Sequence, residues 1–191
     1  MRVAIIGNGN VGTALERGLR RSGHEVYAVG HDPASVRETA RSAEAIVLAV
    51  PFGAIDDVIN ELGDAADGKI LVDVTNALDE SSDLALGFDT SGAEELQRKA
   101  PSTKVVKAFN TVFAEHMDDG HVEDEQLSAM IAGDDADAKA AVMDLARTIG
   151  FDPVDAGPLR NARLLEPMGY QNIQLGYALG LGTQIGFRLV H

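Results

Sequence analysis

The stretch RVAIIGNGNVG, residues 2–12, decides the fold of this chain. Four apolar residues follow Arg2 and lead directly into three glycines at positions 7, 9 and 12. Residues 10–22 then repeat apolar positions at helical spacing, and residues 25–29 (EVYAV) are typical of a strand. We therefore predict a buried strand, a glycine turn, an amphipathic helix and a second strand, in that order.

The rest of the chain continues this alternation. Further strands are predicted at 44–50, 69–74, 104–108, 128–132 and 152–155, and helices after Pro33 and at 55–62, 93–99 and 135–149. Strands that alternate with helices imply parallel pairing. The predicted fold class is α/β, a Rossmann-type, doubly wound, mostly parallel sheet with a short C-terminal helical segment.

The end of the chain has a different composition. Residues 1–158 form the predicted NAD(P)-binding domain, and residues 159–191 a C-terminal helical segment packed on it as a lid, a subunit interface or a plain core helix. The glycines at 176, 180, 182 and 186 would each weaken a helix by about 1 kcal/mol relative to alanine. Such glycines are tolerated where something packs closely against them, and a homodimer through this segment is one interpretation.

Charge and composition narrow the functional class. The chain has 191 residues, 30 acidic against 16 basic side chains, a net charge of −14 and no cysteine. Such a surface repels nucleic acid and anionic membrane, so small-molecule cofactors are the expected partners. With neither an export signal nor an apolar run long enough to span a bilayer, a cytoplasmic location is expected. An acidic chain poor in lysine is also typical of salt-loving archaea.

The three glycines have separate expected roles. Gly7 permits the tight turn, Gly9 lets the backbone approach a pyrophosphate, and Gly12 lets the helix pack on the strand. The pyrophosphate would lie on free N–H groups at the helix N-terminus. A purely structural turn is the alternative, but the strand, turn, helix and strand context favours a dinucleotide.

The end of the second strand should select between the two nicotinamide cofactors. Residues 29–33 read VGHDP. Asp32 would bind the ribose hydroxyls of NAD, whereas His31, with Arg37 nearby, would bind the 2′-phosphate of NADP. Asp32 would alternatively only cap the following helix. The residues themselves leave NADP and NAD both open.

Loops at the carboxyl ends of the other strands should line the same crevice. These loops contribute Val50, Pro51 and Phe52 from VPFG, Asn76 from DVTNAL, and Ala108, Phe109 and Asn110 from KAFNT. The two asparagine amides would bond a ribose or the nicotinamide carboxamide, or else stabilise their own turns.

The motifs GNGNVG, KILVDVTNAL, VVKAFNT, IAGDD and VDAGPLRNARLLE together resemble the family of coenzyme F420-dependent NADP reductases. They are also similar to the cytoplasmic oxidoreductase domain of the STEAP metalloreductases. The resemblance implies hydride transfer between NADP(H) and a deazaflavin (coenzyme F420) or flavin. It assigns Gly7, Asn8, Asn10 and Val11 to the pyrophosphate turn, residues 50–52 to the cofactor crevice, and Asn76, Ala108 and Asn110 to the nicotinamide side. The family usually has an arginine after the second strand, where this chain has Gly30, His31 and Asp32.

Direct hydride transfer between stacked rings needs orientation and exclusion of water, so no catalytic side chain and no metal are predicted. His116 and His121, with two aspartates between them, would form a metal cluster or a solvated acidic loop, and the loop is favoured. An imine or keto-acid reductase is one alternative function, but those enzymes have a helical domain where this chain has only about 30 residues. A non-catalytic NAD(P)-sensing module is the other.

Overall fold

The computed structural model describes residues 1–30, 32–79, 81–86 and 88–190. A seven-stranded sheet has the order β2-β1-β3-β4-β5-β8-β9. The strands are β1 (Arg2–Ile6), β2 (Glu25–Val29), β3 (Ala45–Leu48), β4 (Ile70–Asp73), β5 (Lys104–Lys107), β8 (Ser128–Gly133) and β9 (Asp152–Asp155). All pairs are parallel except β5 with β8, which confirms the predicted mostly parallel sheet.

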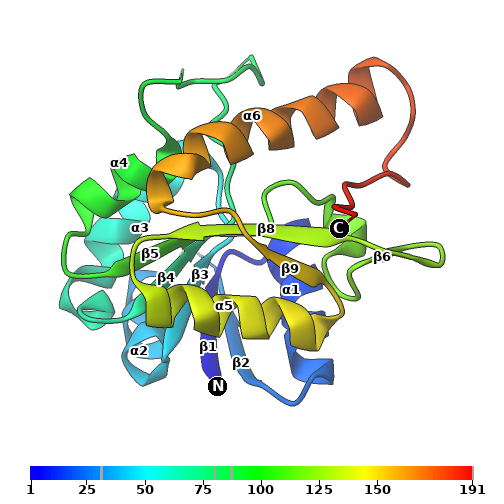
Figure 1. Ribbon diagram of the computed structural model, residues 1–191. Coiled ribbons are helices and arrows are strands. Elements are labelled where there is room, and N and C mark those ends of the chain that lie inside the picture. The colour runs from blue at the N-terminus through cyan, green and yellow to red at the C-terminus, as the bar shows by residue number, and fades with distance from the viewer. Residues whose placement is uncertain (31, 80, 87, 191) are drawn as a thin grey trace.

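Helices cover both faces of this sheet (Figure 1). They are α1 (Asn10–Arg21), α2 (Pro33–Ser42), α3 (Ile55–Leu62), α4 (Gly92–Lys99), α5 (Ala136–Ile149) and α6 (Ala162–Ile173). Alternate residues of β1 belong to two hydrophobic clusters: Val3 and Ile5 pack with α1 and α5, whereas Ala4 and Ile6 pack with α2, α3 and α4. Because successive side chains of a strand point to opposite faces, this alternation gives the doubly wound sandwich.

The chain reverses direction across the sheet next to β1. From β1 it moves to β2 at one edge and then returns past β1 to β3. The carboxyl ends of β1 and β3 therefore define a topological switch point, outside which open α/β sheets bind their ligands. Helix α6 lies across the same side of the molecule (Figure 1).

The C-terminal segment is helical only in its first part. Helix α6 continues as a π-helix through Gln174–Ala178, and residues 180–190 then have no regular structure. Gly180 and Gly182 have φ of +74° and +76°, and a Cβ on Gly186 would lie 2.6 Å from Leu127 Cδ2. These glycines therefore end the helix and let the last residues pack closely against the start of β8.

Two connections were not predicted. A small hairpin pairs β6 (His121–Val122) with β7 (Glu125–Gln126) before β8, which then pairs antiparallel to β5.

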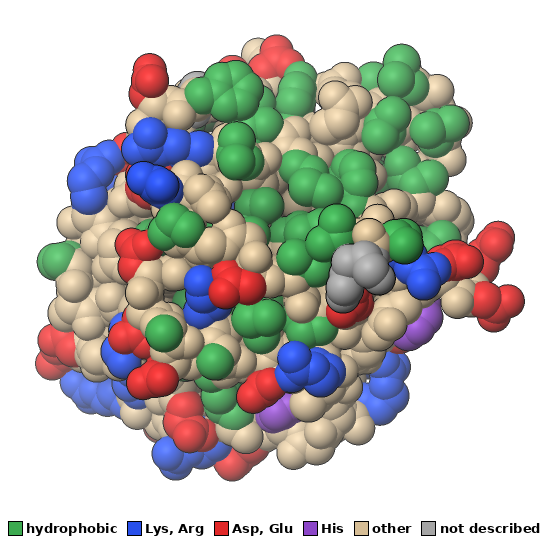
Figure 2. Space-filling view, viewed as in Figure 1, with side chains coloured by type: hydrophobic (Ala, Val, Ile, Leu, Met, Phe, Trp, Pro, Cys, Tyr) green, Lys and Arg blue, Asp and Glu red, His purple; other side chains and the backbone are tan. Residues whose placement is uncertain are grey.

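None of the described helices is long and apolar enough to cross a bilayer. Hydrophobic side chains gather over α6 and the C-terminal end, where Tyr177, Leu179, Leu181 and Val190 are exposed (Figure 2).

Candidate dinucleotide and acceptor site

The turn after β1 requires glycine at two of its three glycine positions. Gly7 has φ +113°, and a Cβ there would lie 2.1 Å from the Ala49 carbonyl oxygen. A Cβ on Gly12 would lie 1.9 Å from the Gly7 carbonyl oxygen. Both approaches are far below van der Waals contact, so the turn itself excludes side chains at these positions, as the spacing predicts.

Gly9 is different because the protein leaves space around it. It is the N-cap of α1 with φ −75°, and a Cβ added to it would meet no described atom within 4 Å. The first N–H bonded within the helix is that of Thr13, which donates to the Gly9 carbonyl. The N–H groups of residues 10–12 therefore have no acceptor within the helix, and no Gly9 side chain caps them. This is the arrangement that binds a phosphate.

Two clefts meet at this turn. The first, which we call the strand-end cleft, has a volume of about 330 Å³ and is lined by Gly9, Asn10, Val11, Ala49, Val50, Pro51, Val74, Thr75, Asn76 and Leu78. The second, the aromatic cleft, has about 340 Å³ and is lined by Asn8, Gly9, Asn10, Thr13, Ala14, Arg17, Phe113, Ala114, Glu115 and Tyr177. Gly9 and Asn10 belong to both, so the turn forms the common wall.

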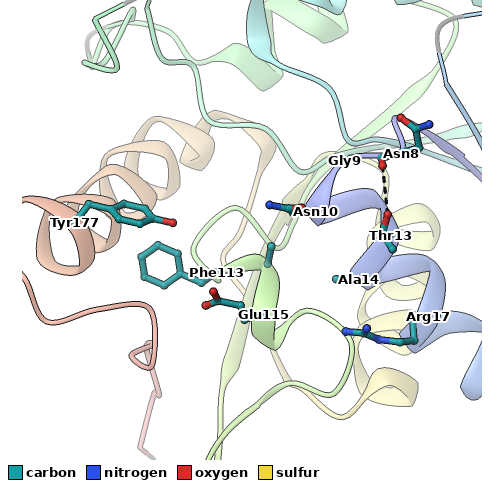
Figure 3. Close-up of a pocket in the computed structure, with 10 residues that line it drawn as sticks. Asn8, Gly9, Asn10, Thr13, Ala14, Arg17, Phe113, Glu115 and Tyr177 are labelled. Carbon is teal, nitrogen blue, oxygen red and sulfur yellow. Dashed lines mark hydrogen bonds between the residues drawn. The ribbon is translucent and has the colours of Figure 1, made fainter.

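An aromatic pair forms the far wall of the second cleft (Figure 3). The rings of Phe113 and Tyr177 lie edge to face, with centroids 5.6 Å apart and an interplanar angle of 86°. Gly176 permits this packing, because a Cβ there would lie 2.7 Å from Phe113 Cζ. The Asn10 side chain points from α1 toward the two rings (Figure 3).

The two predicted amides bond each other. Asn110 Nδ2 donates to Asn76 Oδ1 over 2.8 Å and to the Leu165 carbonyl of α6 over 2.7 Å, while Asn76 Nδ2 donates to the Asn110 carbonyl over 3.1 Å. Asn76 lines the strand-end cleft, but Asn110 is 4% exposed and lies behind it. The structure therefore places Asn110 where it orients Asn76, and a direct bond from Asn110 to a nicotinamide stays a prediction.

Of the other residues predicted near these amides, some line the strand-end cleft and some do not. Val50 and Pro51 line the strand-end cleft, whereas Phe52 lines a separate small cleft between α3 and α4. Ala108 and Phe109 are buried. Phe109 has φ +62°, a conformation costly for a bulky residue and frequent near functional sites.

At the end of β2, Asp32 acts as the cap of α2. Its carboxylate accepts the Ser35 N–H over 2.9 Å and the Ser35 hydroxyl, and these two hydrogen bonds lower the pKa of Asp32. Arg37 pairs with Asp64, on the connection from α3 to β4. Gly30 lies against the Asn8 side chain, and His31 falls outside the described residues.

The 116–121 loop differs from the solvated loop that the sequence suggested. His116 is 5% exposed and its Nε2 lies 2.8 Å from the Thr183 carbonyl oxygen, while Asp118 pairs with Arg17 of α1 over 2.6 Å. The loop is held against α1 because Gly18 allows its backbone to approach: a Cβ on Gly18 would lie 2.7 Å from the Asp118 carbonyl oxygen. The interpretation as a solvated loop is therefore wrong for His116 and Asp118. Among the described residues, no group of three or more metal-ligating side chains occurs.

A buried charged network escaped prediction entirely. Lys107 Nζ lies 2.9 Å from Asp73 Oδ2 and 3.0 Å from Glu166 Oε1, and all three side chains are almost inaccessible to solvent. The available signal was a charged last residue in two neighbouring strands with apolar centres, ILVD and KVVK.

The fold and the glycine turn together define a dinucleotide-binding α/β protein. The family described as NADP oxidoreductase, coenzyme F420-dependent, matches residues 2–44 and 29–77. A crystal structure of a putative F420-dependent NADP reductase from Arthrobacter sp. FB24 superposes with a TM-score of 0.92 at 30% identity and covers 100% of both chains. The chain belongs to this family of NADP-linked oxidoreductases.

Two curated relatives represent the two groups that the sequence motifs resemble, the metalloreductases and the F420-dependent NADP reductases. Metalloreductase STEAP3 of Rattus norvegicus is 32% identical over 177 residues, which cover 86% of this chain and 36% of that protein. The F420-dependent NADP reductase of Methanothermobacter marburgensis is 29% identical over 204 residues, which cover 87% of this chain and 88% of that protein. This chain thus spans about a third of the metalloreductase and most of the reductase.

Proposed function

We propose that this protein transfers hydride between NADP(H) and a deazaflavin of the coenzyme F420 type, or a flavin. The observation that carries the proposal is the open helix N-terminus at Gly9, which forms the shared wall of two clefts. One ligand bound over the turn and a second bound beside it would meet at this wall.

The residues present fit a dinucleotide. The free N–H groups of residues 10–12 would bind the pyrophosphate, and the space at Gly9 would admit it. In the doubly wound fold the nicotinamide half extends to the β3 and β4 side, which corresponds to the strand-end cleft with Val50, Pro51, Thr75 and Asn76. The reduced nicotinamide, when bound, supplies the hydride and both electrons.

The aromatic cleft is the proposed position of the acceptor. Phe113 and Tyr177, which already pack edge to face, provide an apolar wall for a planar ring. An aromatic contact between the acceptor ring and one of these side chains would add roughly 0.5–1.5 kcal/mol beyond the buried area. The protein's part is to orient two rings and exclude water, and the acceptor takes its accompanying proton from solvent.

A stopped-flow scan of NADPH and NADH against coenzyme F420, FMN and FAD tests the proposal. We expect NADPH oxidation with coenzyme F420 or one of the flavins. Tight NADPH binding without oxidation by any of the three acceptors would instead indicate a dinucleotide-sensing module. Oxidation that needs an imine or a keto acid would indicate a small-molecule reductase.

A further inference from the structure

Three charged side chains lie in the interior next to the strand-end cleft. Lys107 and Asp73 are 0% exposed and the Glu166 side chain is 4% exposed. Lys107 Nζ contacts a carboxylate oxygen of each acid, at 2.9 and 3.0 Å, and donates to the Thr75 carbonyl over 2.5 Å. Two carboxylates thus face one ammonium group, which leaves one surplus negative charge.

Backbone N–H groups stabilise that surplus charge. Glu166 accepts the N–H groups of Gly92 and Ala93 at the start of α4, over 3.0 and 3.3 Å. Asp73 accepts the Thr75 N–H over 2.9 Å. Burial lowers the pKa of Lys107, but the attraction of Asp73 and Glu166 outweighs it and the pKa is raised, so the ammonium stays charged. Lys107 also lines neither cleft, so it is not placed to pass a proton to a ligand there.

Stability alone gives this network little purpose. Removing charges from water is costly, and an apolar set of the same size often stabilises a core equally well. Charge-assisted hydrogen bonds differ from apolar contacts in that each one holds two particular atoms in a defined geometry. The positions held by these bonds therefore indicate the role of the network.

The bonds converge on the wall of the strand-end cleft. Thr75 is held at its N–H and hydroxyl by Asp73, and at its carbonyl by Lys107. Helix α6 is attached through Glu166 to Lys107 and through the Leu165 carbonyl to Asn110. One turn later Gly169 packs on the Asn76–Asn110 pair, since a Cβ there would lie 2.5 Å from Asn76 Oδ1.

We infer that Asp73, Lys107 and Glu166 form a positioning network that fixes the Thr75–Asn76 wall and the α6 helix around the nicotinamide end of the bound cofactor. The inference rests on the proposed function for its effect on rate. Its effect on the wall itself is independent of any acceptor. None of the three side chains lines either cleft, so they act through Thr75 and Asn76.

Glu166→Gln and Lys107→Met test the inference, with Lys139→Met as the matched control. Lys139 also pairs with a carboxylate, Asp155, over 2.8 Å and donates to the Gly157 carbonyl, but unlike Thr75, the backbone partner of Lys107, neither of these residues lines a cleft. Lys107→Met leaves two carboxylates unpaired in the core and can prevent folding. In that case Glu166→Gln tests the inference, because it removes one charge and keeps the size and shape of the side chain.

Two measurements are made below the melting temperature of every variant. Amide hydrogen exchange without ligand should be at least tenfold faster over residues 75–78 in Glu166→Gln, and unchanged in Lys139→Met. Single-turnover hydride transfer at saturating NADPH and acceptor should fall tenfold or more, while the Kd for NADPH stays within threefold. A lower melting temperature with unchanged exchange and rate would show a merely structural role and overturn the inference. If the wild-type protein transfers no hydride, the proposed function fails, but the exchange measurement still decides on the network.

Discussion

Replacement of Gly9 by alanine separates cofactor binding from folding. The site has φ −75°, which any residue adopts, and no described atom lies within 4 Å of the new Cβ. Alanine raises the free energy of unfolding by restricting the unfolded chain, and lowers it because alanine is a poorer N-cap than glycine. Each effect is about 1 kcal/mol or less, so the two largely cancel. For a chain of this size the melting temperature should therefore change by no more than about 4 °C.

Binding of the dinucleotide should respond strongly. The added methyl group lies where the pyrophosphate approaches the N–H groups of residues 10–12, and loss of one charge-assisted hydrogen bond costs about 1.5–3 kcal/mol. That cost corresponds to a roughly 10- to 150-fold higher Kd for NADPH. Gly9→Val, with a branched side chain in the same space, should abolish binding.

Isothermal titration with NADPH and thermal melting give both quantities. Gly53→Ala is the matched control, because its Cβ would also meet nothing within 4 Å while Gly53 lines the separate cleft between α3 and α4. Gly12→Ala gives the opposite pattern, since its Cβ would lie 1.9 Å from a carbonyl oxygen and the fold itself should be destabilised. Unchanged NADPH affinity in Gly9→Ala would refute the placement of the pyrophosphate at this turn.

Four other predictions follow from charge and exposure. Because the net charge is −14, raising KCl from dilute to molar should raise the melting temperature by screening self-repulsion, and a flat or falling curve would contradict this. Hydrogen bonds from Arg163 lower the pKa of Glu94, so the ionised Glu94 stabilises the fold above about pH 4.5 and this contribution is lost as the pH falls. In Glu94→Gln the melting temperature should therefore depend less on pH below that value. Thermal melting from pH 3 to 7 measures this. NADP should bind more tightly than NAD, and Arg37→Ala should leave the ratio of their Kd values within about threefold because Arg37 is paired with Asp64, as titration of both cofactors would show. The exposed apolar C-terminal end should support self-association, so light scattering should give a dimer that Leu181→Asp weakens, and a monomer in the wild type would refute this.

Local patterns predicted the elements that position the dinucleotide. The apolar run before Gly7 and the helical spacing after Gly9 determine β1 and α1 by short-range sterics, so their bounds were found almost to the residue. The antiparallel pairing of β5 with β8 was not predictable in the same way, because the neighbour of a strand is chosen by packing between distant segments.

The candidate site was predictable where it is made of backbone and not where it is made of paired side chains. The open N-terminus at Gly9 follows from glycine spacing alone. The role of Asn110 behind Asn76 depends on contacts between residues 34 positions apart and on α6, and the partners of Lys107 are similarly distant. Likewise, Tyr177 joins Phe113 only because glycine at 176 lets the last helix approach, which no local pattern indicates.

Transfer of deuterium from NADPH labelled at nicotinamide C4 tests the central claim most directly. The protein is incubated with coenzyme F420 and the labelled cofactor in ordinary water, and the reduced acceptor is analysed by mass spectrometry. Direct hydride transfer between ligands in the two adjoining clefts predicts that label from one face of C4 is retained in the acceptor, one atom per turnover. Reduced acceptor that has lost the label to water would contradict direct transfer and with it the proposed arrangement of the two clefts.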